Sequence, residues 1–161
     1  IGDERMKYWY PMASIVQSGG RIALASDGPL MWQDTFSRLE AAITRLDPKA
    51  EGGEPLSPHQ AIDLTTGLKA MTLDSAYLMN IEDSVGSIEV GKCADMIVLD
   101  KNLFEIPVEK IDTTQVLLTV FDGKLVFEAG VSPDEEKEIE EHYGVALDFT
   151  GDCGHPGCEW H

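Results

Sequence analysis

One carboxylate in this sequence stands where enzymes often place a catalytic group. The stretch ALASDGP, residues 23–29, is an apolar run that ends in Ser26 and Asp27, after which Gly28 and Pro29 bend the chain. Catalytic side chains of barrel enzymes follow the carboxyl ends of parallel strands, because the loops there converge on one cleft. A carboxylate in such a place can accept and return a proton. The same residues also fit a simple turn, so the pattern leaves a catalytic and a structural interpretation of Asp27 open.

The carboxyl-terminal end of the chain holds a second group of chemically capable side chains. Cys153, His155, Cys158 and His161 are of the types that bind zinc tetrahedrally. Their spacing, C-x-H-x2-C-x2-H, is not one of the usual zinc-finger spacings. Three interpretations therefore stay open for this tail: a second metal site, a disulfide between Cys153 and Cys158, or an end without regular structure.

Other residues carry weaker signals. His59 and His142 lie among polar residues, so we expect them to face solvent. Tyr8, Trp9 and Tyr10 fit either the lining of a substrate cleft or the packing of a loop. The sequence contains no P-loop, no Gly-rich dinucleotide fingerprint, no H-E-x-x-H and no G-x-S-x-G. Phosphate-binding and serine-hydrolase chemistry therefore find no support.

Composition and charge narrow the range of partners. The chain has 161 residues, 43% of them hydrophobic, which is enough to bury a core. Twelve Lys and Arg against 29 Asp and Glu give a net charge of −17, which repels nucleic acids and anionic bilayers. No apolar run approaches the roughly 20 residues that span a bilayer, and no signal segment opens the chain. We expect no nucleic-acid or membrane partner, and a cytoplasmic location.

Helical spacing and turn residues predict the elements that would position Asp27. Residues 12–20 fit a short helix that ends at a Gly-Gly pair, and the unbroken apolar run 22–25 predicts a strand buried on both faces. Asp34 is predicted to cap a second helix, and residues 57–60, SPHQ, form a capping-box pattern that predicts a third. The apolar stripes of these two helices are Phe36, Leu39, Ile43 and Leu46, and Ala61, Leu64, Leu68 and Met71.

After Asp83 the pattern changes to short strands. Residues 86–100, GSIEVGKCADMIVLD, predict two extended runs around Gly91, and residues 116–128, VLLTVFDGKLVFE, predict two more around an Asp-Gly turn. Four short strands do not readily close a core alone, so this part is predicted to belong to a small β domain. The charged stretch 133–144 that follows is predicted to form a solvated helix.

Several of these stretches together resemble one family. They are YP-x2-SI-x3-G followed by ALASDGP, then GLKAMTLDSAY, then GSIEVGKCADMIVLDKNLF, and then VLLTVFDGKLVF. This series resembles the carboxyl-terminal part of metal-dependent amidohydrolases. It is most similar to the amidohydrolase 3 branch, which includes N-substituted formamide deformylases. The stretch GSIEVGKCADMIVLD is the most specific, and the resemblance covers about residues 5–128.

The resemblance implies an α/β fold that comprises the last strand and wall helices of a (β/α)8 barrel plus the C-terminal strands of a small β-sandwich domain. On this template, residues 22–26 are the eighth barrel strand, helices between 34 and 77 close the barrel wall, and residues 87–128 supply sandwich strands. The implied parts are the barrel part at 1–82, the sandwich strands at 83–130, and an acidic, helical tail with Cys and His at 131–161.

The resemblance also implies a role for Asp27, which matches the family's aspartate at the end of strand eight. In the family, that residue binds or adjoins a divalent metal of the zinc type. It acts as general base on the metal-bound water and then passes the proton to the leaving amine. The metal lowers the pKa of its water from about 15.7 toward 7. The family's other ligands are chiefly histidines on earlier strands, including an H-x-H that this sequence lacks.

We therefore interpret the chain as the C-terminal fragment of a hydrolase that cleaves a non-peptide C–N bond in a small-molecule amide or formamide substrate. We expect the fragment alone to be inactive. A (β/α)8 barrel needs about 250 residues, and the first residue is Ile1 rather than Met. The alternative is a non-catalytic scaffold or interaction module derived from the β-sandwich. Because unpaired strands expose their edges, we expect pairing with the missing part of the polypeptide or with a second copy.

Overall fold

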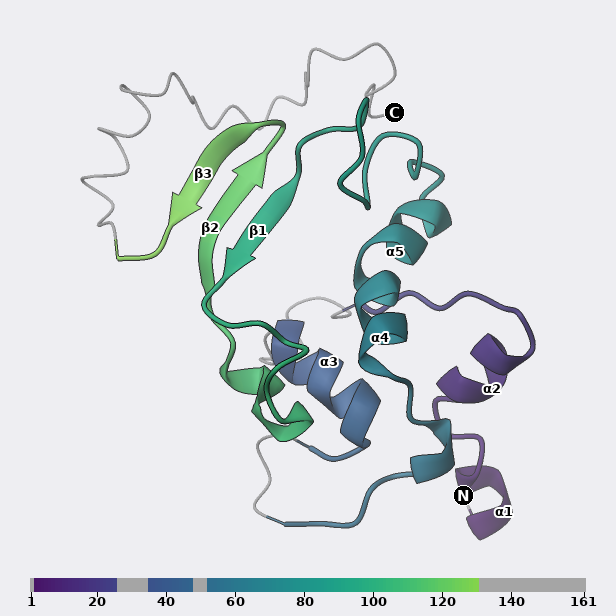
Figure 1. Ribbon diagram of the computed structural model, residues 1–161. Helices are drawn as coiled ribbons and strands as arrows, with labels where there is room; N and C mark the ends of the chain where they lie inside the picture. The colour runs from purple at the N-terminus through teal and green to yellow at the C-terminus, as the bar shows by residue number, and fades with distance from the viewer. Residues whose placement is uncertain (1, 26–34, 48–51, 131–161) are drawn as a thin grey trace.

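A computed structural model describes residues 2–25, 35–47 and 52–130, in which short helices come first and a small sheet last (Figure 1). In chain order the elements are α1 (Asp3–Met6), α2 (Met12–Gln17), α3 (Thr35–Thr44), the 3₁₀ helix η2 (Pro58–Gln60), α4 (Leu64–Met71), α5 (Leu73–Leu78), β1 (Met96–Leu99), the 3₁₀ helix η3 (Val108–Thr113), β2 (Val116–Phe121) and β3 (Lys124–Glu128). The short helix predicted after residue 12 is confirmed as α2, and Gly19 follows it with a φ of 83°.

The core forms where α3 meets the connection between β1 and β2. Phe36 and Leu39 lie three residues apart on one face of α3, and they pack against Leu103 and Ile111 of that connection. Leu39 and Ile111 are 0% exposed. Figure 1 shows η3, in green, beside α3. The connection between two strands therefore attaches the sheet to the helices.

Helix α4 also packs against Leu39 of α3. Gly67 permits the close approach, because a Cβ built at that position would stand 2.5 Å from Leu39 Cδ1. The backbone also joins the two segments, since the Ile62 N–H donates to the Ala42 carbonyl at 3.3 Å. The helix predicted from the apolar stripe after residue 34 is thus confirmed as α3, and its Phe36 and Leu39 are buried as expected.

The capping box predicted at residues 57–60 is wrong. Ser57 has a left-handed backbone, with φ 50°, and makes no capping hydrogen bond, since its hydroxyl donates to the Met6 carbonyl instead. The helix begins later, at α4, where Asp63 Oδ1 accepts the Thr66 N–H at 2.8 Å. An Asp at this position is worth about 1 kcal/mol as a cap. The pattern placed the helix start six residues too early because a second capping residue lay close by.

The strand predicted at residues 22–26 is not found at 22–25, which form neither helix nor strand, and Ser26 lies outside the described residues. A parallel strand needs neighbouring strands to pair its backbone groups. In the described part of the chain, the Leu24 N–H donates to the Ala70 carbonyl of α4 at 3.0 Å. Residues 22–24 are only partly buried and Ala25 is exposed, and Leu24 packs against the core formed by the helices and the β1–β2 connection.

The sheet is antiparallel with the order β1-β2-β3. The predicted hairpin is confirmed: Asp122 and Gly123 join β2 to β3 with φ values of 49° and 75°, both in the left-handed region that tight hairpin turns require. Of the two extended runs predicted around Gly91, only the second forms a strand, β1. The first holds Ile88 and Val90, which are exposed and unpaired in the described structure, so the described sheet has three strands instead of the expected four.

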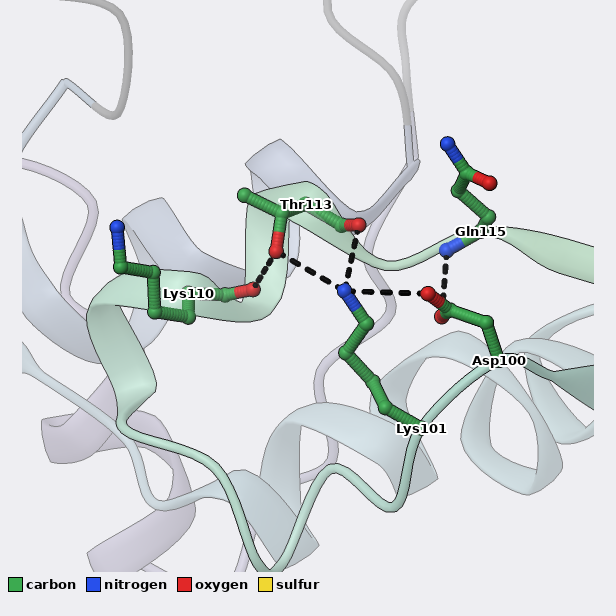
Figure 2. Close-up of polar contacts among 5 residues, drawn as sticks. All are labelled: Asp100, Lys101, Lys110, Thr113 and Gln115. Carbon is green, nitrogen blue, oxygen red and sulfur yellow. Dashed lines mark hydrogen bonds and ion pairs between the residues drawn. The ribbon is translucent and has the colours of Figure 1, made fainter.

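Polar contacts join the two ends of the connection that carries η3 (Figure 2). They involve Asp100, Lys101, Thr113 and Gln115, which are called the polar clasp below. The Gln115 N–H donates to Asp100 Oδ1 at 2.9 Å, and Lys101 Nζ donates to the Thr113 carbonyl at 2.8 Å and lies 3.2 Å from Asp100 Oδ2. The hydrogen bond from Gln115, and secondarily Lys101, hold the pKa of the Asp100 carboxyl below its ordinary value. The clasp thus joins the end of β1 to the start of β2, and it fixes the point at which the connection with η3 leaves the sheet.

One face of the sheet stays open in the described structure. Ile97, Thr119 and Phe127 are directly opposite one another across the three strands, and Phe121 follows on the same face. Ile97, Phe121 and Phe127 are all exposed.

No helix in the described ranges has both the length and the apolar character needed to span a lipid bilayer.

The contact between α3 and η3 should dominate stability. We expect Leu39→Ala to lower the free energy of unfolding by about 3 kcal/mol, because it leaves a cavity in the fully buried core. Leu78→Ala is the matched control, since Leu78 is 71% exposed on α5, and it should change stability by less than about 0.5 kcal/mol. Urea unfolding of the 161-residue chain measures both, and equal losses would contradict this view of the core.

Thr114 offers a substitution that should stabilise the chain. Its side chain is buried, and its Oγ1 has no hydrogen-bond partner in the described structure. Thr114→Val keeps the shape and removes a hydroxyl that has lost its water, so we expect a gain of about 1 kcal/mol in urea unfolding. Thr65→Val, at an exposed position of α4, is the comparison and should not stabilise. A loss of stability in Thr114→Val would show that the hydroxyl has a partner.

Candidate functional site

The predicted catalytic carboxylate lies between two described anchors. Asp27 belongs to residues 26–34, which lie outside the described residues, and so do Cys153, His155, Cys158 and His161 of the tail. What the structure shows is how the chain enters and leaves the Asp27 segment, at Ala25 and at Thr35.

The entry to the segment is fixed to α4 and α5. Leu24 packs on the core and donates its N–H to Ala70. Three residues earlier, the Arg21 guanidinium lies over the Tyr77 ring, 3.9 Å from its centroid, and Arg21 Nε is 3.7 Å from Asp74 Oδ1. Arg21 is half-exposed, so each of these contacts is worth about 1 kcal/mol or less. Leu24, which is partly buried, adds an apolar contact with the core and a backbone hydrogen bond to this anchor.

The exit from the segment is α3 itself. Thr35 begins the helix, and Phe36 is buried in the core at its first turn. Both ends of the Asp27 segment are therefore attached to helices that pack on each other, because α3 contacts α4 through Leu39 and Gly67. A segment whose two ends are attached to a packed scaffold is a common setting for a functional residue.

The described residues do not form a metal site. No group of three or more His, Cys, Asp or Glu side chains in the described ranges is placed to hold a metal ion. His59 is exposed, as expected, and its Nε2 lies 2.7 Å from the Lys7 carbonyl oxygen. The histidine nearest to Asp27 in the sequence thus holds the N-terminal segment and is not free to bind a metal through that nitrogen.

The aromatic segment at residues 8–10 lies on the surface, held from below by one arginine. Tyr8, Trp9 and Tyr10 are all exposed in the described structure. Arg45 is buried at the end of α3 with a left-handed φ of 61°, and its burial lowers the pKa of the guanidinium. Arg45 Nη2 donates to the Trp9 carbonyl and Nε donates to the Leu56 carbonyl, each at 2.8 Å. Neither the cleft nor the packing interpretation of the aromatics is decided by these contacts.

Two buried charged residues, Glu40 and Arg45, escaped the sequence-based prediction. Glu40 follows Phe36 by four residues, so helical spacing places it on the same buried face, and this spacing is the signal that could have found it. No comparable signal exists for Arg45, because its acceptors on Trp9 and Leu56 are brought to it by the fold.

Removing the arginine should cost stability. We expect Arg45→Met to lower the free energy of unfolding by about 2 kcal/mol, because two carbonyls lose a charged donor at a buried position. Arg5→Met on the exposed surface of α1 is the matched control and should change stability by less than about 0.5 kcal/mol. Thermal unfolding followed by tryptophan fluorescence, which Trp9 contributes to, checks both, and identical melting curves would contradict the role of Arg45.

Comparisons with known proteins place these elements in context. The sequence profile that describes the amidohydrolase family matches residues 1–127. The N-substituted formamide deformylase of Arthrobacter pascens is 33% identical over 119 residues, which are 74% of this chain and 21% of that protein. The putative amidohydrolase YtcJ of Bacillus subtilis is 26% identical over 128 residues, which are 80% of this chain and 24% of that protein.

A solved structure is similar as well. The crystal structure of an amidohydrolase from Thermotoga maritima MSB8 matches with a TM-score of 0.51 and 26% sequence identity, over 76% of this chain and 26% of that chain. The described helices and the small antiparallel sheet fit the α/β class of this neighbour. The chain spans about a fifth to a quarter of the length of these relatives.

Proposed function

This chain belongs to the amidohydrolase family, and from that premise we propose that the whole protein hydrolyses a C–N bond other than a peptide bond. The observation that carries the proposal is the match over residues 1–127, which includes the ALASDGP stretch. The relative from Arthrobacter pascens, by its name, deformylates N-substituted formamides, and we propose a small amide or formamide as the substrate class. Because the chain spans only part of its relatives, we propose that the 161 residues alone are inactive.

In the proposed reaction, Asp27 is the catalytic base. Its carboxylate takes a proton from the attacking water, the water oxygen bonds to the carbonyl carbon, and the C–N bond breaks. The carboxyl group then returns the proton to the leaving amine, so a formamide gives formate and a free amine. The anchors at Leu24 and Phe36 support this role, because they attach both ends of the Asp27 segment to one packed scaffold.

Members of this family generally use divalent metals, and we propose zinc for the whole protein. The described residues do not fit a metal site, so the proposed ligands lie outside them. Asp27 is the candidate ligand from this chain for the catalytic metal. Cys153, His155, Cys158 and His161 form a separate candidate site in the tail.

We further propose that residues 1–82 belong to the hydrolase barrel, residues 83–130 to the β-sandwich and residues 131–161 to an acidic tail. The open sheet face supports the need for a partner, since Ile97, Phe121 and Phe127 are exposed on it. The remainder of the polypeptide is the proposed occupant, because the relatives are four to five times as long as the matched part.

Substituting Asp27 in the whole protein tests the proposal. Asp27→Asn should lower kcat by about 10²–10⁴-fold or more with an N-substituted formamide, because the amide cannot accept the proton from water. The melting temperature should not fall, since Asn has the shape of Asp. Release of formate measures the turnover.

The control is Asp83→Asn, which changes an exposed carboxylate in a turn and should leave kcat unchanged. Wild-type turnover in Asp27→Asn would contradict the catalytic role of Asp27. A whole protein without turnover on any small amide, even before substitution, would favour the non-catalytic scaffold derived from the β-sandwich.

A further inference from the structure

A carboxyl group is buried in the contact that joins the sheet to the helices. Glu40 is only 5% exposed, and it stands beside Leu39 on the part of α3 that packs against η3. Glu40 Oε2 accepts the Asp112 N–H of η3 at 2.9 Å. This hydrogen bond and the apolar contact of Leu39 with Ile111 hold the same two elements together.

The charges that face Glu40 are of its own sign. From η3, the carboxylates of Asp112 and Glu109 act on it, and both make its ionisation harder. The cations on the two packed elements are Lys110 of η3 and Lys69 of α4, and both are exposed and make no ion pair with Glu40. Within the described part of the chain, the Glu40 carboxylate has one backbone donor and no cation to balance its charge. Burying such a charge is unfavourable.

We propose that Glu40 makes the contact between α3 and η3 sensitive to pH, so that this contact tightens when the carboxyl group binds a proton and loosens when the group releases it. The proposal does not depend on the proposed function. It concerns the contact that attaches the sheet to the helices. Because η3 lies in the connection between β1 and β2, a change in how tightly η3 packs against α3 also changes how firmly the sheet is attached.

The direction follows from proton linkage. Burial is the largest influence on Glu40 and raises its pKa, with the two η3 carboxylates adding to it, while the Asp112 N–H acts the other way. The folded chain therefore holds this proton more tightly than the unfolded chain. The stabilisation is complete below the unfolded pKa of about 4.3 and is lost as the pH rises through the higher folded pKa.

A neutral variant tests the proposal in the 161-residue chain. Glu40→Gln keeps an oxygen acceptor for the Asp112 N–H and cannot ionise. We expect the melting temperature of the variant, relative to wild type, to be higher at pH 8 than at pH 5 by about 2–4 °C. Carboxylates that do not interact with Glu40 titrate alike in both proteins and cancel in the difference, as does any constant effect of the amide. A difference that is the same at both pH values would overturn the proposal.

A second measurement does not rely on that variant folding. In wild type, the NMR shift of the Glu40 side-chain carboxyl carbon should follow the titration of this group, with a midpoint above the ordinary glutamate value. Glu109→Gln removes one facing carboxylate at an exposed position and should lower this midpoint. Glu128→Gln, exposed on β3, is the matched control and should leave it in place. A wild-type midpoint at or below the ordinary value would also overturn the proposal.

Discussion

The packing of Leu39 against Ile111 is the contact on which the rest of the described structure depends. Leu39 of α3 and Ile111 of η3 are the largest fully buried apolar side chains in the described structure. Leu99 of β1 and Val116 of β2 pack against the same core cluster, so the sheet meets the helices here. The polar clasp of Asp100, Lys101, Thr113 and Gln115 joins the two ends of that connection and orients it. The hydrophobic contact stabilises the folded chain, and the polar clasp fixes the direction in which the connection leaves the sheet.

This arrangement links the contact between α3 and η3 to the Asp27 segment. Helix α3 carries Leu39 into the contact with η3, and its first turn is also the exit from residues 26–34. Leu24, at the entry, packs on the same core. A disturbance of the core is therefore expected to reach both ends of the segment.

Local patterns predicted the elements whose stability is local. The β2–β3 hairpin was predictable because Asp122 and Gly123 adopt the left-handed backbone that such a turn needs, and α3 because Phe36 and Leu39 recur at helical spacing. The strand expected at residues 22–25 is not found, because an apolar run does not state which elements pack on it, and here Leu24 packs against a core of helices. The capping box at Ser57 failed because Asp63 competes for the same role a few residues later and has the Thr66 N–H to bond.

The candidate site shows the same boundary between local and distant information. Asp27 was singled out from its place after an apolar run and from resemblance, both readable along the chain. The contacts that attach its segment join residues far apart in sequence, as when the Leu24 N–H finds the Ala70 carbonyl. No periodicity encodes such a pair, since it exists only once α3 and α4 have packed. Sequence therefore names Asp27 as the candidate reacting group, whereas the fold decides what holds the two described ends of its segment in place.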